Sequence, residues 1–279
     1  MRALLICIWT VLASPFWAEE FILASTTSTQ NSGLYDHLLP MFEADTGIKV
    51  KVIAVGTGQA IRIAKNGDAD ALLVHHRPSE DAFLNDGFGS KRFDVMYNDF
   101  VIVGPSDDPA GLQGATDLKD AMSRLIQTQA PFISRGDESG THSRELSLWA
   151  AASIMPKGEW YREIGAGMGA ALNMAAAVEA YTLSDRGTWL SFGNKSNLTV
   201  LYERDRALLN PYGLLLLNQT RFPHVNVQGA AKFAEWITSP KGQKAIGDFR
   251  VGNAQLFCPN ANNEQAQDNN LCPAQGLLE

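Results

Sequence analysis

The sequence is poor in cysteine and has no run of basic residues. It has three cysteines among 279 residues, with no second close pair and no neighbouring histidine, so we expect no metal held by protein ligands. Acidic side chains outnumber basic ones by 30 to 23, which gives a net charge of −7. We therefore expect neither nucleic acid nor an anionic membrane surface as a partner. Charged residues at 19% and apolar residues at 45% indicate a compact globular chain.

A long apolar run occurs only at the N-terminus, which reads MRALLICIWTVLASPFWAEE. Arg2 precedes an apolar run from Ala3 to Ala13, and small residues follow, which is typical of a secretory signal peptide cleaved after Ala18. A retained anchor helix is the alternative, but the run is shorter than the roughly 20 residues that a membrane span needs. The sequence thus predicts a signal peptide at residues 1–18 and a periplasmic mature protein.

The mature chain keeps two cysteines, Cys258 and Cys272, around the polar segment PNANNEQAQDNN. In an oxidising compartment they can form a disulfide that closes a loop over this segment and contributes about 3 kcal/mol by restricting the unfolded chain. We expect residues 258–279 to be a polar C-terminal tail that this disulfide can close.

Strand-like and helix-like segments alternate along the chain after the signal peptide. The loops between them are short, which indicates an α/β fold with a parallel sheet and helices on its faces. The expected strands at the start are FILAS, IKVKVIAVG and ALLVHH, with helices at GLYDHLLPMFEADTG and AIRIAKNGDAD.

The same pattern restarts near residue 104, and β-type connecting runs occur at 95–105 and 199–217. This layout predicts two α/β lobes joined by two crossover segments, with a ligand in the cleft between them. We expect lobe I to comprise residues 19–103 and 208–257, and lobe II residues 104–207.

Three loops share a position and a composition: each follows a predicted strand, opens a helix and is rich in glycine or hydroxyl residues. They are Ser25–Ser28, Gly56–Gly58 and Gly136–Thr141. The first N–H groups of a helix have no acceptor within it, so an anion there gains backbone donors and the favourable end of the helix dipole. Serine and threonine add neutral O–H donors. One such loop is better explained as helix capping, but three at equivalent points predict an oxyanion site.

A net negative charge is compatible with this site, because neutral dipoles in a closed cleft can hold a small oxyanion. One arginine would supply the formal charge and a planar set of donors. Arg135 is the candidate, and we expect Asp137 to orient its guanidinium. Asp70 is the other carboxylate near the loops, and we expect it to be structural.

The loops belong to longer strings that resemble a known family. Similarity to the TupA-type tungstate-binding proteins, the extracytoplasmic receptors of bacterial tungstate ABC importers, runs from about residue 21 to residue 257 and includes STTSTQNSGLYDHLLPMFEADTGIKVKVIAVGTGQA, MYNDFVIVGP, SRGDESGTHSRELSLW and NPYGL. The resemblance implies a periplasmic-binding-protein type II fold. It also implies a monomeric receptor without a cofactor or catalysis that binds tungstate or molybdate and delivers it to a membrane permease.

The family's motifs can be carried over residue by residue. Its TTTS loop begins with serine here, its GTG loop offers one threonine, and its RGDxSGTH motif offers an arginine and the start of a helix. The oxyanion ligands implied in this way are Ser25, Thr26, Thr27, Ser28, Thr57, Arg135, Ser139, Gly140 and Thr141. Ala171 stands where relatives commonly have a threonine in GMGATLN, which removes one donor if that position touches the ligand.

The candidate anions differ in whether they carry a proton near neutral pH. Hydrogen phosphate carries a proton near neutral pH and benefits from a carboxylate acceptor, whereas tungstate and molybdate are fully deprotonated and need donors only. A receptor for phosphate or another oxyanion with the same fold is therefore the alternative. No residue decides between tungstate and molybdate, so that preference comes from the family alone.

The same segments are compatible with other classes of function. A secreted hydrolase could use Ser139, His142 and either Asp137 or Glu145, but side chains so close together on one helix do not converge on an attack line. A sensor of the same fold without a transport role is a third class. GAGMGA, at residues 165–170, matches a dinucleotide signature, although a glycine turn that opens a helix, or a backbone donor to the anion, explains it better.

The sequence leaves more than one role open for several polar side chains. His75 and His76 are adjacent on a predicted strand, so one buried and one exposed histidine is favoured over a metal site. His142 is either a surface group or a donor in the cleft wall. Ser184 and Arg186 lie in SDRG, a predicted turn, from which they can reach the cleft.

Overall fold

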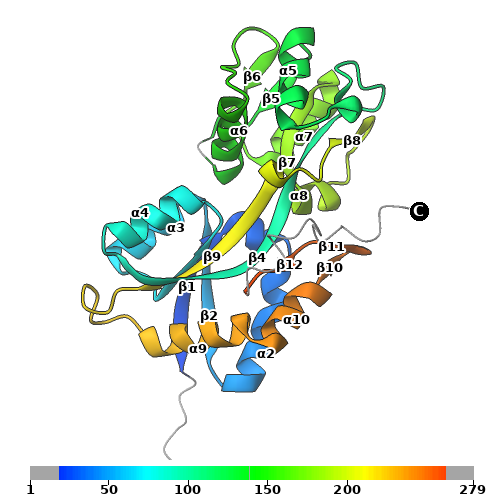
Figure 1. Cartoon of the computed structure of the whole chain (residues 1–279). Helices are drawn as coiled ribbons and strands as arrows, with labels where there is room; N and C mark the ends of the chain where they lie inside the picture. The colour runs from blue at the N-terminus through cyan, green and yellow to red at the C-terminus, as the bar shows by residue number, and fades with distance from the viewer. Residues whose placement is uncertain (1–18, 138, 262–279) are drawn as a thin grey trace, which may run out of the picture.

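The computed structural model describes residues 19–137 and 139–261. The predicted signal peptide and Cys272 lie outside the described residues. Figure 1 shows two lobes, one above the other, connected by the long strands β4 (Gly89–Pro105) and β9 (Leu209–Leu217). β4 pairs with strands of both lobes, whereas β9 pairs with β3 and β4 within the sheet of the first lobe.

The sheet of the first lobe has the strand order β2-β1-β3-β9-β4. β1 pairs in parallel with β2 and β3, which confirms the parallel arrangement predicted from the alternating pattern. β9 runs antiparallel to both β3 and β4, so the joining strands make the sheet mixed. The first three strands are β1 (Glu20–Thr26), β2 (Lys49–Val55) and β3 (Ala71–Val74).

Six helices of the described chain belong to this lobe. They are α1 (Thr27–Asn31), α2 (Leu34–Thr46), α3 (Thr57–Asn66), α4 (Arg77–Asn85), α9 (Val227–Thr238) and α10 (Pro240–Asp248). Ser239 both ends α9 and caps α10, whose first residue is a proline, because the first helical position needs no N–H donor. The sequence did not predict α4, since only Glu80 and Phe83 of that helix are buried and its apolar periodicity is faint.

The second lobe continues the sheet with the order β4-β7-β5-β6, and β8 also pairs with β4. Its remaining strands are β5 (Phe132–Ser134), β6 (Tyr161–Glu163), β7 (Tyr181–Asp185) and β8 (Leu198–Tyr202). Its helices are α5 (Leu118–Thr128), α6 (Gly140–Ala151), α7 (Met168–Val178) and α8 (Arg186–Ser191), with short 3-10 turns at η1 (Leu112–Gly114) and η2 (Arg206–Leu208).

The segment SDRG is not the turn that its composition predicts. Asp185 ends β7 and caps α8, because its carboxylate accepts the backbone N–H of Thr188 at 2.8 Å and the hydroxyl of the same residue at 2.6 Å. An aspartate at this position satisfies a donor that would otherwise lack an acceptor. Arg186 is therefore the first residue of a short helix.

Separate groups of apolar side chains fill the two lobes. In the first lobe, Phe21, Phe42 and Phe233 pack together, whereas Phe132 and Trp149 lie in the centre of the second. The packing along β4 changes lobe between Tyr97 and Phe100, since Val95 and Met96 face the first core and Phe100 and Ile102 the second. The lobe boundaries at 103/104 and 207/208 stay a prediction.

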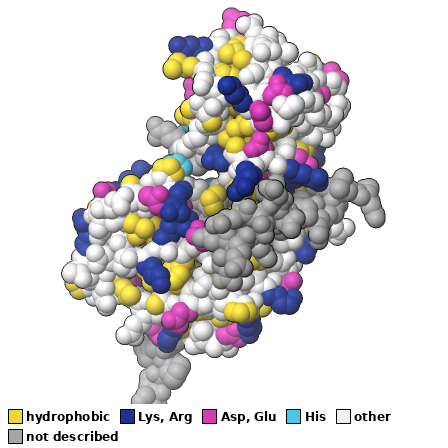
Figure 2. Space-filling model, viewed as in Figure 1, with side chains coloured by type: hydrophobic (Ala, Val, Ile, Leu, Met, Phe, Trp, Pro, Cys, Tyr) yellow, Lys and Arg dark blue, Asp and Glu magenta, His cyan; other side chains and the backbone are white. Residues whose placement is uncertain are grey.

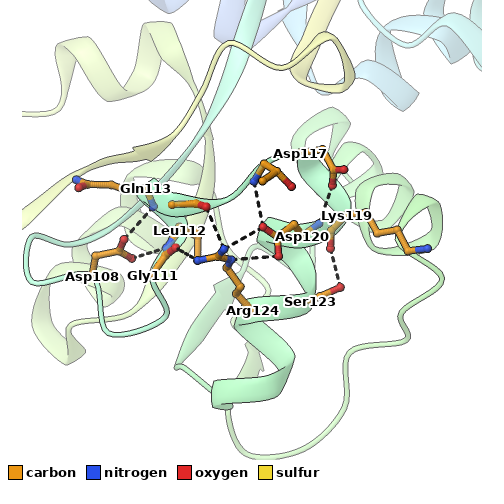
Figure 3. Close-up of polar contacts among 11 residues, drawn as sticks. Asp108, Gly111, Leu112, Gln113, Asp117, Lys119, Asp120, Ser123 and Arg124 are labelled. Carbon is orange, nitrogen blue, oxygen red and sulfur yellow. Dashed lines mark hydrogen bonds and ion pairs between the residues drawn. The ribbon is translucent and has the colours of Figure 1, made fainter.

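A network around Arg124 fixes the loop that leads into α5. The guanidinium donates to the carbonyl oxygens of Gly111 at 2.7 Å and Gly114 at 3.0 Å, and it pairs with Asp120 at 3.0 Å. Asp108 accepts the backbone N–H groups of the turn that follows it (Figure 3). This arginine therefore bonds to groups within the second lobe, away from the joining strands.

The last described strands return the chain to the first lobe. They are β10 (Arg250–Val251), β11 (Ala254–Gln255) and β12 (Cys258–Pro259), and β12 pairs with β4. Cys258 is disulfide-bonded. Within residues 19–137 and 139–261, no helix has both the length and the apolar character needed to cross a bilayer.

Candidate oxyanion-binding site

The loop between β5 and α6 is shaped by a glycine. Gly136 has φ of 59°, and a β-carbon on this residue would lie 2.8 Å from Cβ of Glu163, so both the backbone conformation and the space exclude larger residues. Ser139 then caps α6, and its hydroxyl accepts the backbone N–H of His142 at 3.2 Å. The strand end, the turn and the helix start that the sequence predicts are all present.

Arg135 lies at the end of β5 with its guanidinium held in place. Nε and Nη2 donate to Oδ2 of Asp137 at 3.1 and 2.5 Å, and Nη1 donates to Oγ1 of Thr141 at 3.4 Å. Burial raises the pKa of Asp137, but hydrogen bonds from Ser139 and Arg135 outweigh it and hold the pKa below its usual range. The expected pairing of Asp137 with Arg135 is confirmed, and the carboxylate is ionised at neutral pH.

The start of α6 meets the first lobe at two residues. A β-carbon on Gly140 would lie 3.2 Å from Oγ1 of Thr57 and 3.3 Å from Cε1 of His75. Thr57 is the first residue of α3 and is 8% exposed. The Gly56–Gly58 and Gly136–Thr141 loops therefore approach each other so closely that there is no room for a side chain at Gly140.

Ser25 does not offer a donor to an anion, contrary to the expectation. Its side chain is fully buried, and its hydroxyl donates to the carbonyl oxygen of Leu73 at 2.8 Å while it accepts a hydrogen bond from the Tyr35 hydroxyl. The physical reason is that Ser25 lies within β1, whose residues from Leu23 to Thr26 are all buried.

The remaining hydroxyls of this loop form a cluster at the start of α1. Oγ1 of Thr26, the capping residue, lies 2.7 Å from Oγ1 of Thr29 and 3.1 Å from Oγ of Ser28. Thr26 is buried, Thr27 is exposed and Ser28 is half-buried. Thr27 and Ser28 thus have more accessible side chains than Thr26.

Asp70 is structural, as expected. Its two carboxylate oxygens accept the backbone N–H groups of Ile22 and Asn226, each at 2.6 Å. It therefore ties β1 to the segment before α9 and does not face the anion-binding loops.

Ser184 and Arg186 are directed into the protein. Ser184 is fully buried and donates to the carbonyl oxygen of Asp185 at 3.0 Å. Arg186 is 4% exposed and donates to both oxygens of Asp99 at 2.6 Å and to Glu203 at 2.7 Å. These bonds lie at the junction of β4 and the second lobe, while Nη1 of Arg186 is a buried donor without a hydrogen-bond partner among the described residues.

The hydrolase set is not assembled in the structure. Ser139 contacts the backbone of His142, while the imidazole Nε2 of His142 lies 3.5 Å from Oε1 of Glu163. Glu145 accepts hydrogen bonds from Trp149 at 3.1 Å and from Tyr161 at 2.7 Å. The imidazole of His142 therefore pairs with Glu163, a carboxylate outside the predicted set. His142 is 8% exposed, so it does not face water.

Ala171 lies in the core of the second lobe and is fully buried on α7. The loss of a threonine at this position thus removes no accessible donor in this chain. Gly167, in the GAGMGA segment, caps the same helix, as expected for a glycine turn that opens a helix.

The two adjacent histidines are both half-buried, so the expectation of one buried and one exposed is wrong. Strand alternation does not apply to them because β3 ends at Val74. Nδ1 of His75 lies 3.0 Å from Oδ1 of Asn210, and Nδ1 of His76 lies 2.6 Å from Oγ of Ser79. Among the described residues, no group of three or more His, Cys, Asp or Glu side chains could hold a metal ion.

His75 was missed as a site residue, although its position carried a signal. It follows β3 just as Ser28 follows β1 and Thr57 follows β2, and these strand ends lie at the same edge of the sheet. The contact with Gly140 could not be predicted, because it depends on how the two lobes are placed.

Basic and acidic side chains are interspersed over both lobes on the face shown in Figure 2. This distribution agrees with the absence of a basic run in the sequence. Arg135 directly precedes the Gly136–Thr141 loop and places a positive charge beside it.

Comparison with known proteins places these features in a family context. Residues 13–241 match a family model described as the PBP superfamily domain. A tungstate-binding protein TupA from Peptoclostridium acidaminophilum is 48% identical over 246 residues, which cover 87% of this chain and 86% of the relative.

Two solved structures are similar along most of the chain. TupA from Desulfovibrio alaskensis G20, a tungstate-binding protein, superposes with a TM-score of 0.81 at 44% identity and covers 88% of this chain and 100% of its own. The tungstate ABC transporter structure from Geobacter sulfurreducens gives a TM-score of 0.75 at 50% identity, with coverage of 83% and 99%. At these coverages the likeness extends over most of the chain.

Proposed function

Because the chain belongs to the PBP superfamily and, within it, to the TupA family of tungstate-binding proteins, we propose that it is an extracytoplasmic receptor for tungstate. It captures the anion between its lobes and delivers it to the permease of an ABC importer. The observation that carries this proposal is the contact of Gly140 with Thr57 beside the guanidinium of Arg135.

The proposed ligands come from both lobes. Arg135, Thr141, the hydroxyl of Ser139 and the backbone N–H of Gly140 supply the charged and helix-start donors of the second lobe. The first lobe supplies neutral donors from Thr26, Thr27, Ser28 and Thr57. Ser25 holds the start of this loop in place through its hydrogen bonds to Leu73 and Tyr35.

A fully deprotonated anion fits this chemistry better than hydrogen phosphate. Both oxygens of Asp137 already accept hydrogen bonds, from Arg135 and from the backbone N–H of Ser139 at 3.3 Å. A protonated anion would need an acceptor directed at it, and these hydrogen bonds direct the carboxylate of Asp137 at its own loop. Tungstate is therefore proposed as the ligand, with molybdate next and phosphate as the alternative of a different receptor class.

The setting of the receptor is part of the proposal. A monomer exported to the periplasm through the signal peptide at residues 1–18 would meet the importer at the membrane. No catalytic step is proposed, because the polar groups of the site hold one another and an anion without placing a nucleophile beside a base.

Competitive calorimetry with tungstate, molybdate, sulfate and phosphate tests the function. We expect tungstate to bind most tightly, molybdate next, and sulfate and phosphate weakly. Tightest binding of phosphate would move the protein to another class of receptor, and absence of binding for all four anions would refute the site.

A further inference from the structure

We propose that His75 is a positioning residue through which the strands that join the lobes act on the anion site. This inference rests on the proposed function and adds a residue that does not come from any of the three anion-binding loops. His75 contacts the joining strands, the Ser25–Ser28 loop and the start of α6.

The contact with the joining strands fixes the imidazole tautomer. Asn98 of β4 and Asn210 of β9 are cross-strand partners, and Nδ2 of Asn210 donates to Oδ1 of Asn98 at 2.7 Å. Oδ1 of Asn210 is then the atom that faces Nδ1 of His75 at 3.0 Å, and an amide oxygen can only accept. Nδ1 of His75 therefore carries the hydrogen.

The other imidazole nitrogen faces the Ser25–Ser28 loop. In a neutral ring with hydrogen on Nδ1, Nε2 is an acceptor, and it lies 3.5 Å from Oγ of Ser28. The Ser28 hydroxyl is thus the donor of this long contact and uses its single hydrogen there. The contact orients Ser28 at the start of α1, and the donor that Ser28 then offers to the anion is its backbone N–H in the first turn of the helix. Burial lowers the pKa of His75, in agreement with the neutral form.

The ring also carries the contact with the second lobe. Cε1 of His75 is the atom 3.3 Å from a β-carbon on Gly140, and the ring packs against Tyr212 of β9 with centroids 4.7 Å apart. A change in the angle between the lobes, which bends β9, therefore moves the surface that supports the imidazole.

The lobes do not pack continuously around this contact. A cavity of about 110 Å³ lies beside it, lined by residues of both lobes and of β9 that include His75, Gly140, Arg144 and Asn210. With open space on this side, the contact of His75 with Gly140 transmits lobe closure locally to Ser28. Loss of this link should release the anion faster without slowing its capture.

Stopped-flow binding of tungstate to the full chain tests the proposal. His75→Phe keeps an aromatic ring beside Tyr212 but removes both nitrogen atoms. We expect the dissociation rate constant to rise about tenfold, as for loss of two neutral hydrogen bonds, with the association rate constant within about twofold of the parent. His75→Asn should recover part of this loss, because its amide can still donate to Asn210.

A double-mutant cycle separates the link from local damage. Asn210→Leu removes the partner of His75, so the double variant with His75→Phe should release tungstate no faster than the faster single variant. His76→Asn is the matched control, since the imidazole of His76 bonds to Ser79 of its own helix, and it should leave both rate constants unchanged.

The outcomes separate failure of this inference from failure of the function. If the parent binds no tungstate, the proposed function fails. If the parent binds and His75→Phe releases tungstate at the parental rate, or if the two substitutions act additively, His75 is not a positioning residue. If His75→Phe unfolds, the same comparison is made with His75→Asn, for which a parental release rate again overturns the inference.

Discussion

The two lobes present different chemistry to the space between them. The first offers neutral hydroxyls that are already bonded to one another, such as Thr26 with Ser28 and Thr29. The second offers a guanidinium whose carboxylate partner is only two residues away in sequence. An anion obtains both charge and a full set of donors only when it touches both lobes. With the proposed ligands, this division of donors would link binding to closure.

Loss of the charged donor of the second lobe should weaken tungstate binding the most. Arg135→Ala removes the guanidinium, and we expect tungstate affinity to fall about 10- to 100-fold, because hydrogen bonds to charged groups contribute more than neutral ones. Isothermal titration calorimetry measures the change. Arg124→Ala in the same lobe is the matched control, since that arginine binds loop carbonyl oxygens and Asp120. Unchanged affinity of Arg135→Ala would contradict the assignment.

A substitution that prevents the close approach of the two lobes should have the next largest effect on binding. Gly140→Val places methyl groups where Thr57 and His75 already lie, so the lobes cannot approach as closely. We expect about tenfold weaker tungstate binding, as for an overpacked contact that costs about 1–3 kcal/mol, and a larger radius of gyration with tungstate present by small-angle X-ray scattering. Gly193→Val is the control, because a β-carbon on Gly193 meets no atom within 4 Å. Closure and affinity equal to the parent would contradict this account of the contact.

A single neutral donor of the first lobe should matter less. Thr57→Val keeps the shape of the side chain and removes its hydroxyl, so we expect affinity to fall about three- to tenfold, the effect of one neutral hydrogen bond. Thr128→Val, on the surface of α5, serves as the control in the same titration. A loss as large as that of Arg135→Ala would show that charge is not what distinguishes the lobes.

Ser25 should affect stability and leave binding almost unchanged. Ser25→Ala removes the acceptor of the buried Tyr35 hydroxyl, so we expect the free energy of unfolding to fall by about 1–3 kcal/mol in urea titrations. Tungstate affinity should stay within about twofold of the parent. An affinity loss equal to that of Thr57→Val would place Ser25 at the anion after all.

Much of the molecule could be predicted from local patterns in the sequence. The strands β1, β2 and β3, the split between α9 and α10 at Ser239, and the pairing of Asp137 with Arg135 all follow from periodicity, capping or short sequence separation. These features depend on residues close together in the chain, which is why sequence alone was sufficient.

The errors concern directions and distances that the sequence does not encode locally. Ser25 has the same hydroxyl as its neighbours, and only the position where β1 ends decides that it points inward. α4 buries few apolar residues, and α8 was not predicted because the composition of SDRG is typical of a turn. The contact of His75 with Gly140 joins residues far apart in the chain, so no local pattern could predict it.

The order of the strands has a consequence for how the chain reaches its native state. β9 fills the position between β3 and β4, yet it comes after the entire second lobe in the sequence. A chain that emerges from its N-terminus therefore exposes the edge of β3 until residues beyond Leu209 have appeared. The second lobe has all of α5–α8 and β5–β8 before then, so it can fold first. Until β9 is synthesised, the first lobe exposes an unpaired strand edge, which can aggregate or bind a chaperone.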